Sequence, residues 1–304
     1  LDAVKHIYHN EFSDENPEFL KKFYKAVNDY YRLSRDHDIY MVGEVFSGYE
    51  QVAPYYKGLP ALFEFSFWHR LQWALEQNTG CYLTKDILSF QNFYKQYRPD
   101  YIRATKLSNH DENRARSDLA GSLAKAKLAG AILLTAPGSP YVYYGEEMGY
   151  IGTKTRGDLY VRSPMYWGDS YTTSYTDEID ATLAQTVGTV LTQQSDTASI
   201  LNVYRKFSRA RNTYPALASG TMTEHPLYND KAFSAYPQLA AWYLTGGGEK
   251  MLVLHNLGKD QVTFSLDDPL DYAAATLGNV YIQEEKEGYK VKMDAYSSVV
   301  FVLK

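Results

Sequence analysis

Up to residue 216, short apolar runs alternate with longer stretches in which apolar residues recur at helical spacing. The apolar runs predict strands at Ile39–Val42, Leu62–Phe67, Ala104–Ser108 and Tyr141–Tyr144. The periodic stretches predict helices at Pro17–His37, Trp68–Gln77, Lys85–Arg98, Leu119–Leu134 and Ala198–Asn212. Strands that alternate with helices are typical of βα units around a parallel sheet, and Ile39–Val42 is apolar enough to be buried on both faces.

From about residue 218 the pattern changes to short β-rich runs separated by turn residues. The expected strands are Ala232–Tyr236, Ala240–Thr245, Met251–Leu257, Val262–Leu266, Val280–Glu284, Tyr289–Met293 and Ser298–Leu303. This spacing predicts an antiparallel sandwich. We therefore predict two domains, 1–216 and 217–304. The polar segment 150–197 is expected to be largely irregular, as in a functional loop region.

Composition excludes several classes of function. The 304 residues carry a net charge of −5 and a pI near 5.8, which argues against a nucleic-acid partner. No apolar run reaches the length of a membrane span. The single cysteine, Cys81, forms no internal disulfide, and with scattered histidines it offers no zinc spacing. The 29 tyrosines suit sugar stacking at a wet surface.

Three expected strand ends each close on a carboxylate: Asp2, Glu44 and Asp111. Gly43, just before Glu44, would let the backbone pass close to a neighbour. A salt-bridged Glu at a strand end is the simpler interpretation of Glu44 alone. However, the carboxyl ends of barrel strands converge on one mouth, and paired carboxylates there suit glycoside hydrolysis.

Five segments resemble conserved segments of the α-amylase family, glycoside hydrolase family 13, in the family's order. They are Leu1–His6 (LDAVKH), Gly43–Phe46 (GEVF), Ser108–Arg114 (SNHDENR), Gly138–Gly149 (GSPYVYYGEEMG) and Arg162–Trp167 (RSPMYW). Within the family, the chain is most similar to the surface α-amylases of bacterial starch-utilisation systems. The resemblance implies the C-terminal half of a (β/α)8 TIM barrel, from the end of strand four to helix eight, followed by an antiparallel β-sandwich.

The resemblance assigns the chemistry to the three carboxylates. Asp2 would be the nucleophile that forms a covalent glycosyl-enzyme, and Glu44 the acid/base. Asp111 would hold sugar hydroxyls and stabilise the transition state. The outcome would be retention of anomeric configuration, with the carboxyl groups of Asp2 and Glu44 about 5–5.5 Å apart.

Four further residues acquire roles by the same resemblance. His110 would donate to a hydroxyl of the same sugar, while Lys5 and His6 would meet the sugar on the leaving-group side. Without the motif, Lys5 would be read as a surface charge. Arg114 would orient a carboxylate. Many members carry a structural calcium bound by the backbone carbonyl of the residue that matches His6, so calcium is a plausible cofactor, with its other ligands outside this chain.

A half barrel leaves sheet edges and an apolar face open. We therefore expect the N-terminal half of the same protein as a partner, together with starch, amylopectin and maltooligosaccharides as ligands. The resemblance also implies an extracytoplasmic or cell-surface location, although no targeting signal is present in the chain.

Exposed aromatic residues raise the possibility of sugar contacts outside the catalytic site. Trp73 lies opposite the apolar stripe of its helix, so it either is covered by the following loop or forms a secondary glucan platform with Tyr82 and Asp86. Three tyrosines of the loop 47–60 either line subsites or pack the loop: Tyr49, Tyr55 and Tyr56.

Two alternative functions stay open. One is an α-glucosidase, neopullulanase-like or transglucosylating member of the same family. Ala3 and the Lys5-His6 pair are more similar to endo-acting α-1,4 enzymes. The other is a non-catalytic member that only binds glucan, although such members typically lose catalytic carboxylates and all three are present here.

Overall fold

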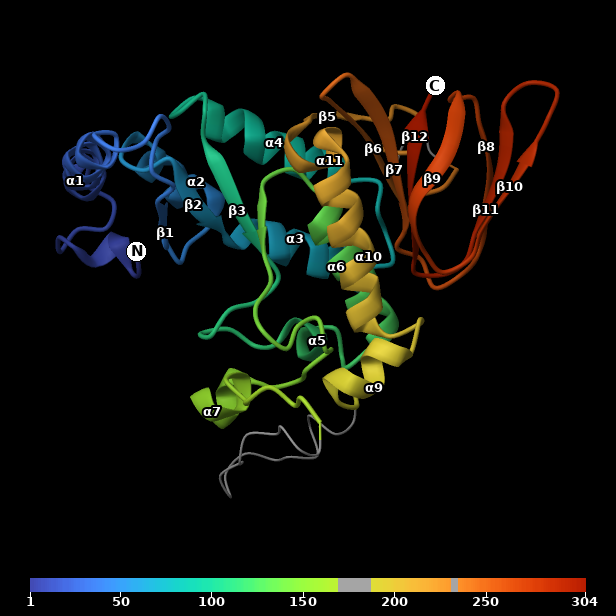
Figure 1. Ribbon diagram of the computed structural model, residues 1–304, viewed down its shortest axis with the longest axis horizontal. Coiled ribbons are helices and arrows are strands. Elements are labelled where there is room, and N and C mark those ends of the chain that lie inside the picture. Colours follow the sequence, from blue (N-terminus) through green and yellow to red (C-terminus); the bar gives the residue numbers. More distant parts are fainter. Residues whose placement is uncertain (169–186, 231–234) are drawn as a thin grey trace. The chain divides into compact units, whose positions relative to one another are not determined.

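The computed structural model describes residues 1–168, 187–230 and 235–304 and contains two compact units (Figure 1). The first, here the sheet unit, comprises Leu1–His69, Asp86–Lys106 and Gly138–Tyr141. The second, here the sandwich unit, comprises Arg70–Lys85, Leu107–Pro137 and Val142–Lys304. Each unit is described by itself.

Four parallel strands form the sheet of the first unit, in the order β1-β2-β3-β4. Their bounds are β1 Val42–Gly43, β2 Ala61–Glu64, β3 Ile102–Lys106 and β4 Ser139–Tyr141. In the parallel register, Val42 pairs with Ala61, and Leu62 with Arg103. Because the four strands are parallel, their carboxyl ends all lie at the same edge of the sheet.

Helices cover this sheet and supply its core. They are α1 Glu15–Tyr31, α2 Tyr49–Val52, the 3₁₀ helix η2 Ala53–Lys57, the first turn of α3 Phe65–Glu76 and most of α4 Leu83–Lys95. Leu20, Leu62 and Phe90 are buried together in this core. Gly43 allows the predicted close approach, because a Cβ there would lie 2.5 Å from Leu59 Cδ1.

The helical part of the sandwich unit is built around two packed helices, α6 and α10. The elements are η3 Lys154–Arg156, α5 Ala115–Asp118, α6 Leu123–Thr135, α7 Asp158–Val161, α9 Val190–Ser195, α10 Ile200–Thr213 and α11 Pro215–Ser219. After Lys127, α6 carries no charged residue, and its residues from Leu128 to Thr135 are all buried. A helix that is apolar all round belongs inside a core.

Two antiparallel sheets complete the sandwich unit, with orders β5-β6-β7-β12-β9 and β10-β11-β8 (Figure 1). The strands are β5 Thr221–Glu224, β6 Leu239–Gly246, β7 Glu249–Asn256, β8 Val262–Leu266, β9 Leu270–Leu277, β10 Val280–Glu284, β11 Tyr289–Met293 and β12 Ser297–Leu303. Alternate residues of β8, such as Val262, Phe264 and Leu266, point into the shared core. The α/β fold class is confirmed, with a partial barrel sheet followed by an antiparallel sandwich.

Several predicted elements differ from the structure. The run Leu62–Phe67 does not continue as a strand, because helix α3 begins at Phe65. The run Ile39–Val42 contributes only Val42 to β1, and Tyr40 is 46% exposed, so burial on both faces was wrong. Strands β5 and β9 were missed. Most of the expected strand Ala232–Tyr236 lies outside the described residues, as does the middle of 150–197.

None of the described helices is long and apolar enough to cross a membrane.

Candidate active site

Backbone hydrogen bonds hold the segment that carries Asp2 along the outer edge of β1. The Leu1 nitrogen donates to the Val42 carbonyl over 2.8 Å, and the Glu44 N–H donates to the Leu1 carbonyl over 2.9 Å. This pair of bonds is the pattern of a parallel ladder. Residues 1 and 2 therefore lie beside β1 as the tip of a neighbouring strand would, with Asp2 and Glu44 at the same edge.

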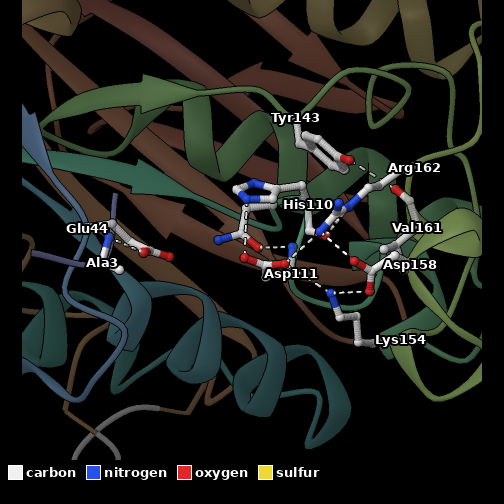
Figure 2. A network of polar contacts seen from close by, with 10 residues as sticks. Ala3, Glu44, His110, Asp111, Tyr143, Lys154, Asp158, Val161 and Arg162 are labelled. Carbon is white, nitrogen blue, oxygen red and sulfur yellow. Dashed lines mark hydrogen bonds and ion pairs between the residues drawn. The ribbon is translucent and has the colours of Figure 1, made fainter. Parts of the chain in front are cut away.

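The chain turns sharply just after Asp2, and this turn reaches Glu44. Ala3 takes a left-handed conformation at φ 47°, and its N–H donates to Glu44 Oε2 over 3.1 Å (Figure 2). Both Asp2 and Ala3 are exposed, whereas Glu44 is half-buried. The bond fixes one oxygen of Glu44 and leaves the Asp2 carboxylate accessible from solvent.

Lys5 stabilises the loop that follows Glu44. Its ammonium lies 2.9 Å from Glu11 Oε2 and donates to the Phe46 carbonyl over 3.1 Å. Only 18% of its side chain is exposed, so it is not a free surface charge. His6, the next residue, is exposed.

Asp111 lies in the sandwich unit, after β3, in a dense network of charges (Figure 2). Its Oδ1 accepts from Lys154 over 3.0 Å and from Arg162 over 2.9 Å, and its Oδ2 lies 3.2 Å from His110 Nε2. Asp158 is 2.6 Å from Lys154 and 2.8 Å from Arg162. The hydrogen bond from Lys154 is the main cause that lowers the pKa of Asp111 below its usual range.

The sequence missed Lys154, Asp158 and Arg162 as site residues. The first and last flank Asp158 at a spacing of four residues on each side, which is the spacing of ion pairs on a helix. The structure has no single helix here, because η3 ends just before Gly157, which takes φ 108°, and α7 begins at Asp158. The spacing was a usable signal for ion pairs, but the sequence did not indicate that Lys154 and Arg162 would reach Asp111.

Arg114 is almost completely buried. Its Nη1 donates to the Tyr144 carbonyl, and its guanidinium lies 4.2 Å from the Tyr143 ring centroid and 5.6 Å from that of Tyr150. Burial lowers its pKa, whereas the charge of the Glu146 carboxyl acts in the opposite direction. Carbonyl and cation–π contacts hold Arg114 in place, and its role in orienting a carboxylate stays a prediction.

A fourth carboxylate, Glu146, lies buried behind the Asp111 loop. Ser108 Oγ donates to its Oε2 over 3.2 Å, and Tyr204 OH donates to its Oε1 over 2.8 Å. Burial raises the pKa of Glu146 to about 8. Since Ser108 comes three residues before Asp111, a protonated Glu146 supports the base of this loop. The GEEMG run contained Glu146, but only the tertiary contacts separate it from a surface acid.

Comparison with known proteins identifies the family. Residues 2–220 match the family model described as Alpha amylase, catalytic domain, and residues 239–300 match the Alpha-amylase SusG C-terminal domain. The chain belongs to the α-amylase family. The catalytic-domain match includes all three predicted carboxylates, Asp2, Glu44 and Asp111.

Individual relatives agree with this assignment. The chain is 56% identical over its full length to Alpha-amylase SusG of Bacteroides thetaiotaomicron, of which it covers 44%. It is 32% identical to Alpha-amylase 3 of Dictyoglomus thermophilum, over 99% of the chain and 57% of that protein. Among solved structures, Amy13B of Eubacterium rectale superposes with a TM-score of 0.82 at 28% identity, over the whole chain and 59% of its own length. The chain thus spans about half the length of these relatives.

The structure describes the predicted site residues of this α-amylase family chain in two groups. Asp2, Glu44, Lys5 and His6 belong to the sheet unit, whereas His110, Asp111 and Arg114 belong to the sandwich unit. Within the first group, Asp2 and Glu44 lie on neighbouring segments of one sheet edge. The catalytic roles of all these residues stay predictions.

A calcium ion is common in the α-amylase family, but the described part of the chain does not supply a site. Within residues 1–168, 187–230 and 235–304, no group of three or more His, Cys, Asp or Glu side chains could hold a metal. The carbonyl of His6 alone would not form a calcium site, because calcium takes six to eight oxygen ligands. The involvement of His6 stays a prediction.

The aromatic candidates divide into packed and exposed side chains. Tyr55 and Tyr56 are 2% and 1% exposed, which favours loop packing over sugar subsites. Tyr49 packs against Phe90. Trp73 is 42% exposed, so its predicted outward direction is confirmed.

Proposed function

We propose that this chain supplies the catalytic carboxylates of a retaining, endo-acting hydrolase of α-1,4-glucosidic bonds in starch, amylopectin and maltooligosaccharides. The observation that carries the proposal is that Asp2, Glu44 and Asp111 all occur within the α-amylase match, with Asp2 beside β1, Glu44 directly after β1 and Asp111 after β3. The 56% identity to Alpha-amylase SusG supports an α-glucan substrate. A location outside the cytoplasm or at the cell surface stays part of the proposal.

In this mechanism, Asp2 attacks the anomeric carbon while Glu44 transfers its proton to the departing glycosidic oxygen. The bond between carbon and that oxygen breaks, and a glycosyl ester forms on Asp2. Glu44 then removes a proton from water, which attacks the same carbon and releases Asp2. The Ala3 N–H, 3.1 Å from Glu44 Oε2, would leave the other oxygen to handle the proton.

Asp111 would act on the sugar rather than on the breaking bond. As a negative charge near the ring, it would stabilise the cationic transition state more than the neutral ground state. Its exposed carboxylate and the adjacent exposed His110 are accessible to sugar hydroxyls.

A substitution of the acid/base residue tests the proposal. In the protein that carries this chain naturally, Glu44→Gln should lower kcat on soluble starch by about 10²–10⁴-fold, the typical contribution of a positioned acid/base group. Reducing-sugar release measures the rate, and proton NMR of the first product should show the α-anomer. Glu50→Gln, an exposed carboxylate six residues later, is the matched control and should keep the activity of the parent. A parent inert toward every α-glucan, or a β-anomeric first product, would contradict the proposal.

The products formed from starch distinguish the alternatives within the family. An endo-acting enzyme should release mixed maltooligosaccharides, as proposed here from Ala3 and the Lys5-His6 pair. Glucose alone would favour an α-glucosidase, and elongated products would favour transglucosylation. Binding without any cleavage would favour the non-catalytic alternative.

We also propose a secondary glucan contact at Trp73 and Tyr82, supported by side chains that are 42% and 41% exposed in the sandwich unit. Asp86, the third predicted member, belongs to the sheet unit. Trp73→Ala should weaken binding to insoluble starch severalfold, because a stacking ring is lost, and should leave cleavage of maltotriose unchanged. A pull-down on starch granules, run beside the maltotriose assay, measures both. Equal loss in the two assays would contradict a separate site.

A further inference from the structure

The Asp111 carboxylate is contacted by two cationic side chains and by a histidine ring. Lys154 and Arg162 both donate to the same oxygen, Oδ1, over 3.0 and 2.9 Å (Figure 2). Arg162 Nε also donates to the His110 carbonyl over 3.0 Å. One arginine thus binds both the side chain of Asp111 and the backbone just before it, which fixes the direction of the carboxylate.

Both cations are held in place by contacts that do not involve Asp111 itself. Asp158 contacts Lys154 and Arg162 with its two oxygens. The Lys154 backbone N–H donates to Asn113 Oδ1 over 2.7 Å, and Tyr143 OH donates to the Val161 carbonyl over 3.1 Å. We call Lys154, Asp158 and Arg162 the Asp111 clamp.

The ion pairs of the clamp are too exposed to contribute much to the stability of the fold. The side chains of Asp111, Lys154 and Arg162 are 46%, 35% and 39% exposed. Ion pairs with this exposure contribute little to the free energy of unfolding, because water screens them. Their effect on the ionisation and direction of a carboxylate at the site is the larger consequence.

The proposed chemistry explains why such a device would be needed. In the proposed mechanism, the acid/base Glu44 must carry a proton at working pH. Asp111 must stay ionised at that pH to stabilise a cation. Cations that contact Asp111 allow this carboxylate to stay ionised at a pH at which Glu44 is protonated.

We propose that Lys154 and Arg162 are positioning residues that keep the Asp111 carboxylate ionised and correctly directed. Asp158 is a negative charge that partly offsets the effect of these two cations on Asp111. This inference rests on the proposed function of Asp111. The charged groups described around its carboxyl are His110, Lys154, Asp158 and Arg162. Lys154 and Asp158 act on it with opposite sign.

Because Lys154 and Asp158 carry opposite charges, substitution of each in turn gives a matched pair of variants. Lys154→Met removes a cation and should raise the pKa of Asp111 by about 0.5 to 1 unit, whereas Asp158→Asn removes an anion and should lower it. Carboxyl ¹³C NMR titration measures the pKa directly in the natural protein, with the Asp111 signal assigned by its loss in Asp111→Asn. Lys154→Arg keeps the charge and should restore the parent value.

Kinetics give a second, independent measurement. In Lys154→Met the acidic limb of the kcat/KM profile should move to higher pH, and kcat should fall more than KM rises. In Asp158→Asn the limb should move to lower pH or stay where it is. A merely structural role would lower the melting temperature of both variants without moving the limb in opposite directions.

The possible results are distinct. Opposite movements of the Asp111 pKa support the clamp. An Asp111 pKa that is unchanged in Lys154→Met, or that moves the same way in both variants, overturns the clamp even if the enzyme hydrolyses starch. A parent without activity toward α-glucans but with opposite pKa movements would overturn the proposed function and leave the electrostatic role of the clamp standing.

Discussion

At the residue scale, the site depends on carboxylates in unlike environments. Asp111 is exposed and paired with cations, whereas Glu146 is buried and accepts from the hydroxyls of Ser108 and Tyr204. Cations lower the pKa of the first, and burial raises that of the second to about 8. Near neutral pH Asp111 is therefore ionised and Glu146 is protonated, although the two acids belong to neighbouring motifs.

The raised pKa of Glu146 makes stability depend on pH. The unfolded chain releases this proton near its usual value of 4.5, whereas the folded protein keeps it up to about pH 8. The free energy of unfolding should therefore fall as pH rises between these values and level off above them. Glu146→Gln mimics the protonated acid and removes this dependence.

We expect Glu146→Gln to become more stable relative to the parent as pH rises from 5 to 8, by an amount on the order of a few kcal/mol. Urea unfolding at a series of pH values measures the difference. Glu285→Gln, at an exposed position after β10, is the matched control, and its difference from the parent should stay flat. A Glu146→Gln difference that is also flat would refute the burial effect.

At the scale of elements, the pairing of α6 with α10 positions Tyr204 against Glu146. Gly130 of α6 makes room for this ring, because a Cβ there would lie 2.4 Å from Tyr204 Cε2. From α10, Arg211 donates to the carbonyls of Leu134 and Ala136 over 3.0 Å each, which satisfies the buried end of α6. The glycine is thus explained by packing against a neighbour, not by a turn.

A substitution at Gly130 tests this contact. Gly130→Ala should destabilise the protein by about 1–3 kcal/mol through overpacking, although helix propensity alone would favour alanine. Thermal unfolding measures the change. Ala124→Gly, the reverse exchange at an exposed position of the same helix, should cost about 1 kcal/mol from propensity alone. If Gly130→Ala instead stabilised the protein, Tyr204 would have to move freely, and the packing described here would be wrong.

The same helix shows why element bounds were only partly predictable. The periodic run from Leu119 was expected to be one helix, but α6 begins at Leu123, with Ser122 accepting from the Lys125 N–H as its cap. Similarly, α1 begins at Glu15, and Asn16 binds Tyr8 N–H and the Lys5 carbonyl instead of capping the helix. Tertiary partners thus decided the hydrogen bonds of Asn16, whereas Ser122 caps its own helix.

At the scale of the whole molecule, the predicted order of parallel strands and then an antiparallel sandwich is present. The compact units do not follow that order along the chain, since α6 and α10 belong to the same unit as the sandwich. His255 of β7 contacts Thr135 of α6 over 3.3 Å, in a fully buried position. The boundary between residues 216 and 217 stays a prediction about domains.

The sequence alone determined the family, the change from alternating strands and helices to an antiparallel sandwich, and the three candidate carboxylates, because these patterns and motifs are local in the chain. It could not determine that Lys154 and Arg162 would bind Asp111, more than 40 residues earlier, or that Glu146 would be buried under Ser108. Charge pairing and burial depend on which segments meet in space. The pKa of an acid follows from those neighbours, so only the tertiary structure decided which acids keep their protons.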